Sequence, residues 1–241
     1  MSPQQQEKAK GIVDLVFLID ATGSMQSCIE ALKNNIAMFI ETLTTEDPQN
    51  PSPVKDWRAR VFGYRDVTCD AQPFVEHPFV RDPAQLREHL NQLEAIGGGD
   101  EPESLLDAIY KIATIGQTDK GAQSEDQFKW RYRSSAARVV IIFTDASYHE
   151  TMSIPEVRGG GFDDIVNAVQ ANRIILSIFA PDMPCYDRLS QIDKSEWEPI
   201  DIEGKNPQQA LAEFTSDREN FRETLKQLAK SVSKSAETPE L

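Results

Sequence analysis

The sequence of 241 residues is poor in cysteine, in long apolar runs and in basic side chains. Its three cysteines, Cys28, Cys69 and Cys185, are widely spaced and form no metal-binding motif, so we expect reduced thiols. No apolar run is longer than a strand, which argues against a membrane-spanning helix. Residues 1–10 also lack the apolar core of a signal peptide, and together these features predict a cytoplasmic protein.

A formal net charge of −14 argues against nucleic-acid binding, because the phosphate backbone would be repelled. Basic residues gather locally at 129–133, which we interpret as a solvated loop. The remaining composition, with 39% hydrophobic and 27% charged residues, is that of an ordinary globular protein. The chain is long enough to bury a substantial core.

Short apolar segments alternate with helical patterns along the chain. Buried strands are predicted over 13–19, 59–64, 139–143 and 174–179. Apolar residues at three- and four-residue spacing predict helices over 25–43, 86–93, 105–112 and, last, 211–228. Such alternation indicates crossover connections, and therefore a three-layer, doubly wound α/β fold with a mostly parallel central sheet.

One edge of this sheet is expected to be antiparallel, because residues 74–80 follow the second strand with no room for a helix. The polar stretch 116–135 is predicted to be an inserted loop. We find no internal repeat and no linker, so we expect one domain over residues 11–232, with flexible tails at 1–10 and 233–241.

The first strand ends in three oxygen-bearing side chains at alternate positions, Asp20, Thr22 and Ser24. Ligands of open α/β sheets bind beyond the carboxyl ends of the strands. Carboxylate and hydroxyl oxygens suit Mg²⁺, Mn²⁺ or Ca²⁺, so this loop predicts a divalent-cation site. The alternative is a cap for the following helix, but one cap needs only one side chain.

Two later segments carry matching chemistry. Asp100 and Glu103 lie just before the helix predicted over 105–112, and Asp145 directly follows the strand predicted over 139–143 and its Thr144. Three loops at one end of a sheet could each supply oxygens to a single cation. Asp100 and Glu103 also have the spacing of a capping box, and that alternative stays open.

Together these loops resemble the metal-ion-dependent adhesion site of von Willebrand factor type A domains, over nearly the whole chain. The resemblance implies Asp20, Thr22 and Ser24 as the first ligand group and Asp145 as the last. Glu103 stands where the common form of the family has a Thr, and it is implied as the fourth ligand.

Integrin β-subunit domains, which are similar in the segment before the third helix, imply a second ion. Asp100 would be a ligand of that ion, whereas Asp66 is more readily interpreted as a solvated or salt-bridged strand end. Ser27 and Cys28 replace the acidic pair of the adjacent calcium site in those domains. We therefore expect one cation site and at most one more, and we interpret His149 as an exposed loop residue.

In this family an Asp or Glu of a partner protein completes the coordination of the metal. The resemblance therefore implies Mg²⁺-, Mn²⁺- or Ca²⁺-dependent protein binding, without enzymatic activity, nucleic acid or membrane. The motifs look like those of intracellular bacterial and protist members, which accompany protein kinases and phosphatases in signalling or stress systems. Two alternatives remain: a metal-free scaffold, and a Mg²⁺-dependent haloacid-dehalogenase-like phosphatase, which would need an Asp where Thr22 stands.

Overall fold

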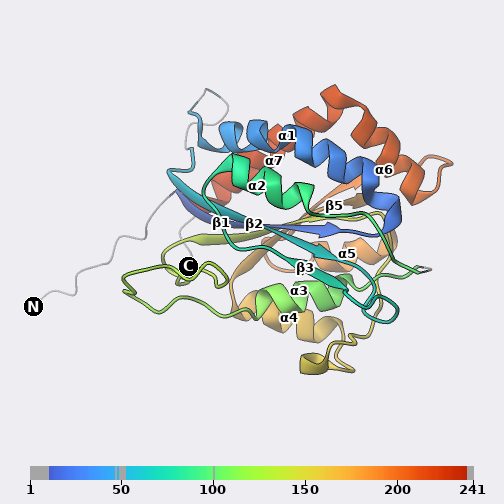
Figure 1. Cartoon of the computed structure of the whole chain (residues 1–241), viewed down its shortest axis with the longest axis horizontal. Helices are drawn as coiled ribbons and strands as arrows, with labels where there is room; N and C mark the ends of the chain where they lie inside the picture. Colours follow the sequence, from blue (N-terminus) through green and yellow to red (C-terminus); the bar gives the residue numbers. More distant parts are fainter. Residues whose placement is uncertain (1–10, 47, 49–52, 100, 238–241) are drawn as a thin grey trace, which may run out of the picture.

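The computed structural model describes residues 11–46, 48, 53–99 and 101–237. Within them lies a six-stranded sheet in the order β3-β2-β1-β4-β5-β6 (Figure 1). The strands are β1 Ile12–Asp20, β2 Asp56–Tyr64, β3 Phe74–Glu76, β4 Ala137–Phe143, β5 Ile174–Pro181 and β6 Glu196–Ile200. The pairs are parallel apart from β2 and β3, so the predicted antiparallel edge is confirmed.

Helices cover both faces of the sheet (Figure 1). One face carries α1 Gln26–Thr44, α2 Pro83–Asn91, α6 Pro207–Ser216 and α7 Arg218–Glu237. The other face carries α3 Leu105–Ala113, α4 Phe162–Ala171 and α5 Pro184–Ser190. Short 3-10 turns occupy Gly23–Met25 and Pro155–Val157. The predicted three-layer, doubly wound α/β fold is confirmed.

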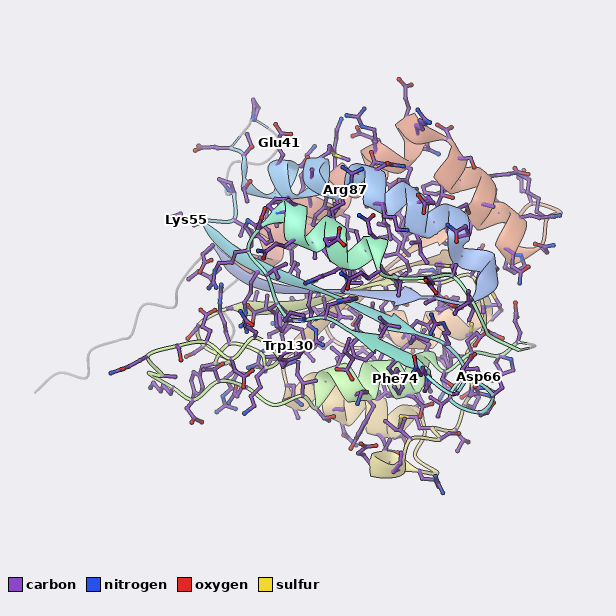
Figure 2. All side chains as sticks on the ribbon, viewed as in Figure 1. Glu41, Lys55, Asp66, Phe74, Arg87 and Trp130 are labelled. Atoms are coloured by element: carbon purple, nitrogen blue, oxygen red, sulfur yellow. The ribbon has the colours of Figure 1, made fainter. Side chains whose placement is uncertain are left out.

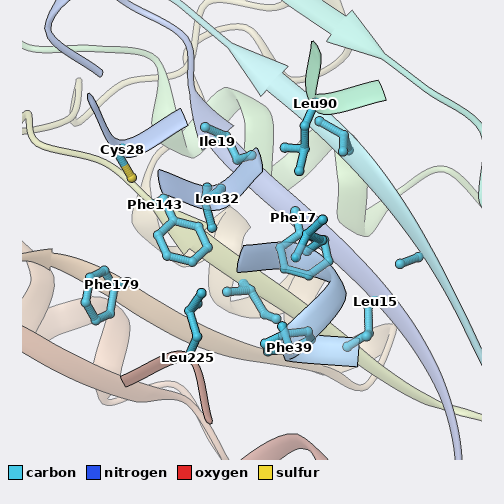
Figure 3. Close-up of a cluster of buried hydrophobic side chains, with 14 of the residues drawn as sticks. Leu15, Phe17, Ile19, Cys28, Leu32, Phe39, Leu90, Phe143, Phe179 and Leu225 are labelled. Carbon is cyan, nitrogen blue, oxygen red and sulfur yellow. The ribbon is translucent and has the colours of Figure 1, made fainter. Parts of the chain in front are cut away.

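Strand β1 shows why the central strands read as continuous apolar runs. Its odd-numbered residues pack with α1 and α7, as Figure 3 shows for Leu15, Phe17 and Ile19, while the even-numbered Val16 and Leu18 pack on the other face. Both faces of a parallel sheet are therefore buried. The two charged residues of β1, Asp14 and Asp20, share the even-numbered face.

The carboxyl-terminal region differs from the prediction. The single helix predicted over 211–228 is two helices, because Asp217 adopts an extended conformation (φ −75°, ψ 92°) between α6 and α7. Helix α7 then continues to Glu237, and the buried Ser233 donates a hydrogen bond to the carbonyl of Leu43. The predicted tail 233–241 is thus helical as far as residue 237. Residues 1–10 and 238–241 lie outside the described residues.

The inserted loop 116–135 holds no helix or strand, as predicted, but its basic cluster is only partly solvated. Trp130 is fully buried, packs on Phe79 at 5.5 Å between ring centroids and donates a hydrogen bond to the carbonyl of Ile112. Arg131 is buried beside Asp14. The interpretation of 129–133 as a solvated loop therefore holds for Lys129 and Arg133 but is wrong for Trp130 and Arg131, which tertiary partners remote in sequence bury.

Strand β6 and helices α4 and α5 were not predicted. Strand β6 lies at the edge of the sheet, where Glu196 and Glu198 are exposed, so it lacks the apolar run of the central strands. No helix in the described part of the chain is long and apolar enough to cross a membrane.

Candidate metal centre

The predicted ligands lie where the winding of the sheet reverses. From β1 the chain reaches β2 and β3 on one side, and it later returns to place β4 on the other side of β1. Such a switch point leaves a crevice at the carboxyl ends of the two central strands. Asp20 is the last residue of β1, and Asp145 lies just beyond the end of β4. The fold therefore brings these two buried carboxylates to one crevice.

Asp20 is held in place by hydroxyl and amide groups. Its Oδ1 accepts hydrogen bonds from the backbone N–H of Thr22 at 2.9 Å and from the Thr22 hydroxyl at 2.7 Å. Its Oδ2 accepts one from the Thr144 hydroxyl at 3.0 Å. Burial raises the pKa of Asp20, and the bonds from Thr22 and Thr144 oppose this increase only in part.

The other hydroxyls of the first loop face the same place. The Oγ1 of Thr22 and the Oγ of Ser24 are 3.4 Å apart. No side chain caps the 3-10 turn at Gly23–Met25 or helix α1. The capping alternative for this loop is therefore wrong, because its oxygen-bearing side chains bond to one another and to Thr144 instead of to the helix.

Asp145 is a buried carboxylate without a hydrogen-bond partner. Both of its oxygens are inaccessible and unpaired among the described residues. Burial and the charge of Asp20 raise the pKa of Asp145 to about 7, and the neighbouring Ser24 hydroxyl opposes this increase in part. An unpaired buried carboxylate is costly, so this position favours a positive ligand.

Glu103 reaches the same crevice from the segment before α3. Its backbone N–H donates to the carbonyl of Ser147 at 2.8 Å, and its carbonyl accepts from the N–H of His149 at 2.9 Å, which ties it to the loop after β4. Its Oε2 is buried and unpaired. Burial, and then the charges of Asp20 and other nearby carboxylates, raise the pKa of Glu103 to about 8.

The capping-box alternative for this segment is wrong. Helix α3 begins at Leu105 with Ser104 as its N-cap, so Glu103 precedes the helix instead of lying in its first turn. Asp100 lies outside the described residues, so its part in a second cation site stays a prediction.

A glycine turn brings the segment before α3 against the first loop. Gly97 and Gly98 have φ values of +72° and +70°, which favour glycine. A Cβ atom at position 98 would lie 2.6 Å from Oε1 of Glu103 and 2.7 Å from Cγ2 of Thr22. The side chains of Glu103 and Thr22 therefore both contact this turn, and any larger residue would push into them.

Arg65, which the sequence did not single out, joins three of these loops. Its guanidinium donates to the carbonyls of Ala21 at 3.2 Å, Gln72 at 3.0 Å and Glu94 at 2.9 Å. It is buried and makes no ion pair in the described part of the chain. Arg65 therefore positions the loops through backbone carbonyls and not through a direct ion pair with a carboxylate. Its place directly after a strand was the available signal, but the sequence could not show which groups it meets.

Asp66 is paired, in contrast to Asp145. Its Oδ1 accepts from the Thr68 N–H and the Ser104 hydroxyl, its Oδ2 accepts from the Thr68 hydroxyl, and His149 lies 3.3 Å away. Burial acts to raise the pKa of Asp66, but these hydrogen bonds outweigh it and hold the pKa below its ordinary value. Asp66 is thus buried and hydrogen-bonded, not solvated as one of our two interpretations had it, and His149 is partly buried beside it and not an exposed loop residue.

The resulting donor set fits a hard divalent cation. Three carboxylates (Asp20, Glu103 and Asp145) and two hydroxyls (Thr22 and Ser24) come from three loops, and three of the carboxylate oxygens are buried and unpaired. Within the described residues, no three Asp, Glu, His or Cys side chains are grouped closely enough to hold a metal by themselves. A cation here would therefore depend on the hydroxyls as well, and oxygen donors of this kind suit Mg²⁺, Mn²⁺ or Ca²⁺.

Comparisons with known proteins support the fold and its family. Residues 14–121 match the family described as von Willebrand factor A domain. The alpha-protein kinase vwkA of Dictyostelium discoideum is 28% identical over 144 residues, which is 60% of this chain and 20% of that protein. Two structures of proximal thread matrix protein 1 from the mussel byssus superpose with TM-scores of 0.51 and 0.50 at 12% identity.

The byssus structures cover 90% of this chain, and at their low identity they show a shared fold alone. The chain spans a fifth of the kinase and less than half of the byssus protein, 46% in one structure and 47% in the other. The family match includes most of β1, the Asp20 loop and the segment that carries Glu103. The matched segment, residues 14–121, is therefore that of a von Willebrand factor A domain.

Proposed function

We propose that this chain is a divalent-cation-dependent protein-binding module. Asp20, Thr22, Ser24, Glu103 and Asp145 would hold Mg²⁺ or Mn²⁺, and the bound ion would offer an open coordination position to an Asp or Glu of a partner protein. The observation that carries this proposal is the pair of buried, unpaired oxygens of Asp145, next to the unpaired Oε2 of Glu103.

The physical basis is an excess of buried negative charge. Asp20, Glu103 and Asp145 raise one another's cost of ionisation, and Arg65 is engaged with backbone carbonyls. Removing a carboxylate from water without a compensating charge is unfavourable. A cation bound from solution would supply the missing positive charge and make this arrangement favourable.

The same residues have distinct parts in holding the ion. The hydrogen bonds from Thr22 and Thr144 fix the orientation of the Asp20 carboxylate, and the glycine turn fixes the position of Glu103. Three carboxylates hold a cation more tightly than two, but they lower its remaining attraction for the carboxylate of a partner. We therefore expect the metal to bind well without a partner.

The structure favours this proposal over the two alternatives. A metal-free scaffold gives no reason for the unpaired oxygens of Asp145. A phosphatase of the haloacid-dehalogenase type would need a carboxylic acid at position 22, where the Thr22 hydroxyl instead donates to Oδ1 of Asp20. We therefore propose binding and not catalysis as the activity of this site.

The partner is proposed from the comparison with the Dictyostelium protein. That relative is named an alpha-protein kinase, and this chain matches a fifth of it. We infer that the present domain serves a cytoplasmic protein-kinase or phosphatase system by binding one of its components.

The proposal is tested by affinity capture from native lysate in the presence of Mg²⁺, in EDTA, and with the variant Asp20→Ala. Glu41→Gln is the matched control, because it removes an exposed carboxylate from α1, far from Asp66 and the crevice beside it (Figure 2). We expect a partner that is retained by Glu41→Gln and lost in EDTA and with Asp20→Ala. A partner retained under all conditions would instead support the metal-free scaffold.

A further inference from the structure

An exposed apolar side chain lies at the rim of the candidate metal centre. Ile96 is 54% exposed and Phe128 is 52% exposed, and these are the large hydrophobic residues exposed in the described part of the chain. Single exposed apolar residues are common on protein surfaces, so exposure alone says little. The position of Ile96 is what distinguishes it from Phe128.

Ile96 is attached directly to the loop of the predicted ligands. Its N–H donates to the carbonyl of Ala21 at 3.0 Å, and the carbonyl of the next residue, Gly97, accepts from the N–H of Gly23 at 3.4 Å. The turn is held from the other side by Asp70, whose Oδ2 accepts from the N–H of Gly98 at 3.0 Å. The backbone of Ile96 is therefore hydrogen-bonded directly to the Asp20 loop, and its side chain is exposed to solvent.

The rim around Ile96 is acidic. Two accessible carboxylates lie near the buried ones: Asp70 accepts a hydrogen bond from the N–H of Gly98, and Glu101 accepts one from the Ser147 hydroxyl in the loop of Asp145. In the described residues of the segments 20–25, 65–72, 94–104 and 144–151, the lone Arg or Lys is the buried Arg65. A divalent cation and Arg65 together would offset three of the five carboxylate charges of Asp20, Asp70, Glu101, Glu103 and Asp145, so the rim would stay negative around the ion.

We infer that the partner presents its carboxylate within a basic segment that also carries an apolar side chain beside that carboxylate. This inference rests on the proposed function and specifies the chemistry of the partner. Lys or Arg residues near the carboxylate would be attracted by Asp70 and Glu101, and the apolar side chain would pack on Ile96.

Two physical terms set this preference. A partner with further acidic residues would approach a negative rim, and like-charge contacts across an interface suppress binding. Because the Debye length is about 8 Å at physiological ionic strength, charges within a few residues of the metal-bound carboxylate are the ones that count. Covering Ile96 removes apolar surface from water, which favours an aliphatic or aromatic neighbour.

The experiment is a selection from a displayed peptide library in which a central Asp is fixed and four residues on each side are random. The chain is immobilised in Mn²⁺, and bound peptides are eluted with EDTA, so that the recovered peptides depend on the metal. Parallel selections use Ile96→Ser, the matched surface variant Phe128→Ser and the rim charge reversal Glu101→Lys, each with its fold verified by circular dichroism.

For the unchanged chain, we expect the eluted peptides to be enriched in Lys and Arg, depleted in Asp and Glu, and enriched in Leu, Ile or Phe within two positions of the fixed Asp. Ile96→Ser should abolish the apolar enrichment and weaken a selected peptide about fivefold. Glu101→Lys should reduce the basic enrichment, and Phe128→Ser should change neither.

The outcomes separate this inference from the proposed function. EDTA-eluted peptides whose flanking residues match the unselected library would overturn the inference and leave metal-dependent binding intact. If EDTA elutes no more peptide than buffer alone, metal-bridged binding fails, and the inference fails with it. Loss of the apolar enrichment with Phe128→Ser as well as Ile96→Ser would also contradict the assignment of Ile96.

Discussion

Asp14 and Asp20 lie on the same face of β1, both fully buried, yet their surroundings differ completely. Asp14 forms a two-point ion pair with the buried Arg58, whose Nε and terminal nitrogen each lie 2.8 Å from a carboxylate oxygen. It also accepts from the backbone N–H of Arg131 at 2.7 Å. Asp20 meets hydroxyl and amide groups, forms no ion pair among the described residues, and has the carboxylate of Asp145 as a neighbour.

The Asp14 cluster shows how this fold satisfies a buried carboxylate when the role is structural. Arg58 also donates to the carbonyls of Asp126 and Lys129 and lies over the ring of Phe79 at 4.3 Å, which fastens the inserted loop to the sheet. The charges there balance within the chain. At the opposite end of β1 they do not, and this contrast is the reason to assign an external cation to the Asp20 cluster.

The largest expected effect is the loss of stability when the charge-balanced cluster of Asp14 and Arg58 is broken. Asp14→Asn would remove the buried counter-charge of Arg58 and leave it only the half-exposed Glu125 at 3.6 Å, so we expect the free energy of unfolding to fall by about 3 kcal/mol. In EDTA, Asp20→Asn removes one of several repelling carboxylates and should change it by less than about 1 kcal/mol, or increase it. Urea denaturation of both variants in EDTA makes the comparison, and equal losses would remove the distinction between the two clusters.

The second effect is stabilisation of the folded chain by a metal ion bound at the unbalanced cluster of Asp20, Glu103 and Asp145. A ligand that binds only the folded chain adds about 2.7 kcal/mol to the free energy of unfolding at a hundredfold excess over its dissociation constant. We therefore expect Mg²⁺ or Mn²⁺ to raise the unfolding temperature of the unchanged chain and of the control Glu41→Gln. Thermal unfolding of Asp20→Asn should show no such increase, and an unchanged increase would place the metal elsewhere.

A third effect is the dependence of stability on pH. The pKa values of Asp145, about 7, and Glu103, about 8, are raised above those of the unfolded chain, which lie near 4. Their contribution is fully present below the unfolded values and is lost as the pH rises through about 7 and 8. In EDTA the urea midpoint should therefore fall between pH 5 and 8.5, and less so in Asp145→Asn.

Saturating Mg²⁺ should cancel most of this decrease, because the cation stabilises the ionised carboxylates. The same urea series in Mg²⁺ is the control. A midpoint that is independent of pH in EDTA would show that Asp145 and Glu103 are not destabilised by their surroundings.

The smallest expected effect comes from a single hydroxyl. Ser24→Ala removes one neutral oxygen from the donor set while all three carboxylates remain, so the affinity for Mg²⁺ should fall about fivefold. The free energy of unfolding in EDTA should stay within about 0.5 kcal/mol. Calorimetric titration measures the affinity, and a complete loss of binding would mean that the carboxylates contribute less than we infer.

Most of the candidate site could be predicted from the sequence, because its candidate ligands directly follow the ends of strands. Asp20 and Asp145 each follow an apolar run, and parallel strands bring such ends together. The choice of Glu103 as a candidate ligand depended on the family resemblance, because its spacing from Asp100 fitted a capping box equally well. The bridging role of Arg65 was not predictable, since its three carbonyl partners belong to different loops.

The charge-balanced cluster of Asp14, Arg58 and Arg131 was not predicted for the same reason. The N–H of Arg131 bonds to Asp14 across 117 positions of sequence, so nothing local distinguishes its basic cluster from a solvated loop. Strand β6 was missed because an exposed edge strand needs no apolar run, and the break at Asp217 interrupts an otherwise continuous helical pattern. The pattern of apolar residues in the sequence thus predicts the central strands and helices of this fold better than the elements at its edges.

The most direct test of the central claim is calorimetric titration of Mn²⁺ into the metal-free chain near pH 7, in two buffers of different ionisation enthalpy. We predict one ion per chain with micromolar or tighter affinity and with release of protons, because Asp145 and Glu103 must ionise to bind it. Asp20→Ala should abolish the binding and Glu41→Gln should preserve it. Absence of binding by the unchanged chain, or equal binding by Asp20→Ala, would contradict the assignment of the unbalanced cluster as a metal centre.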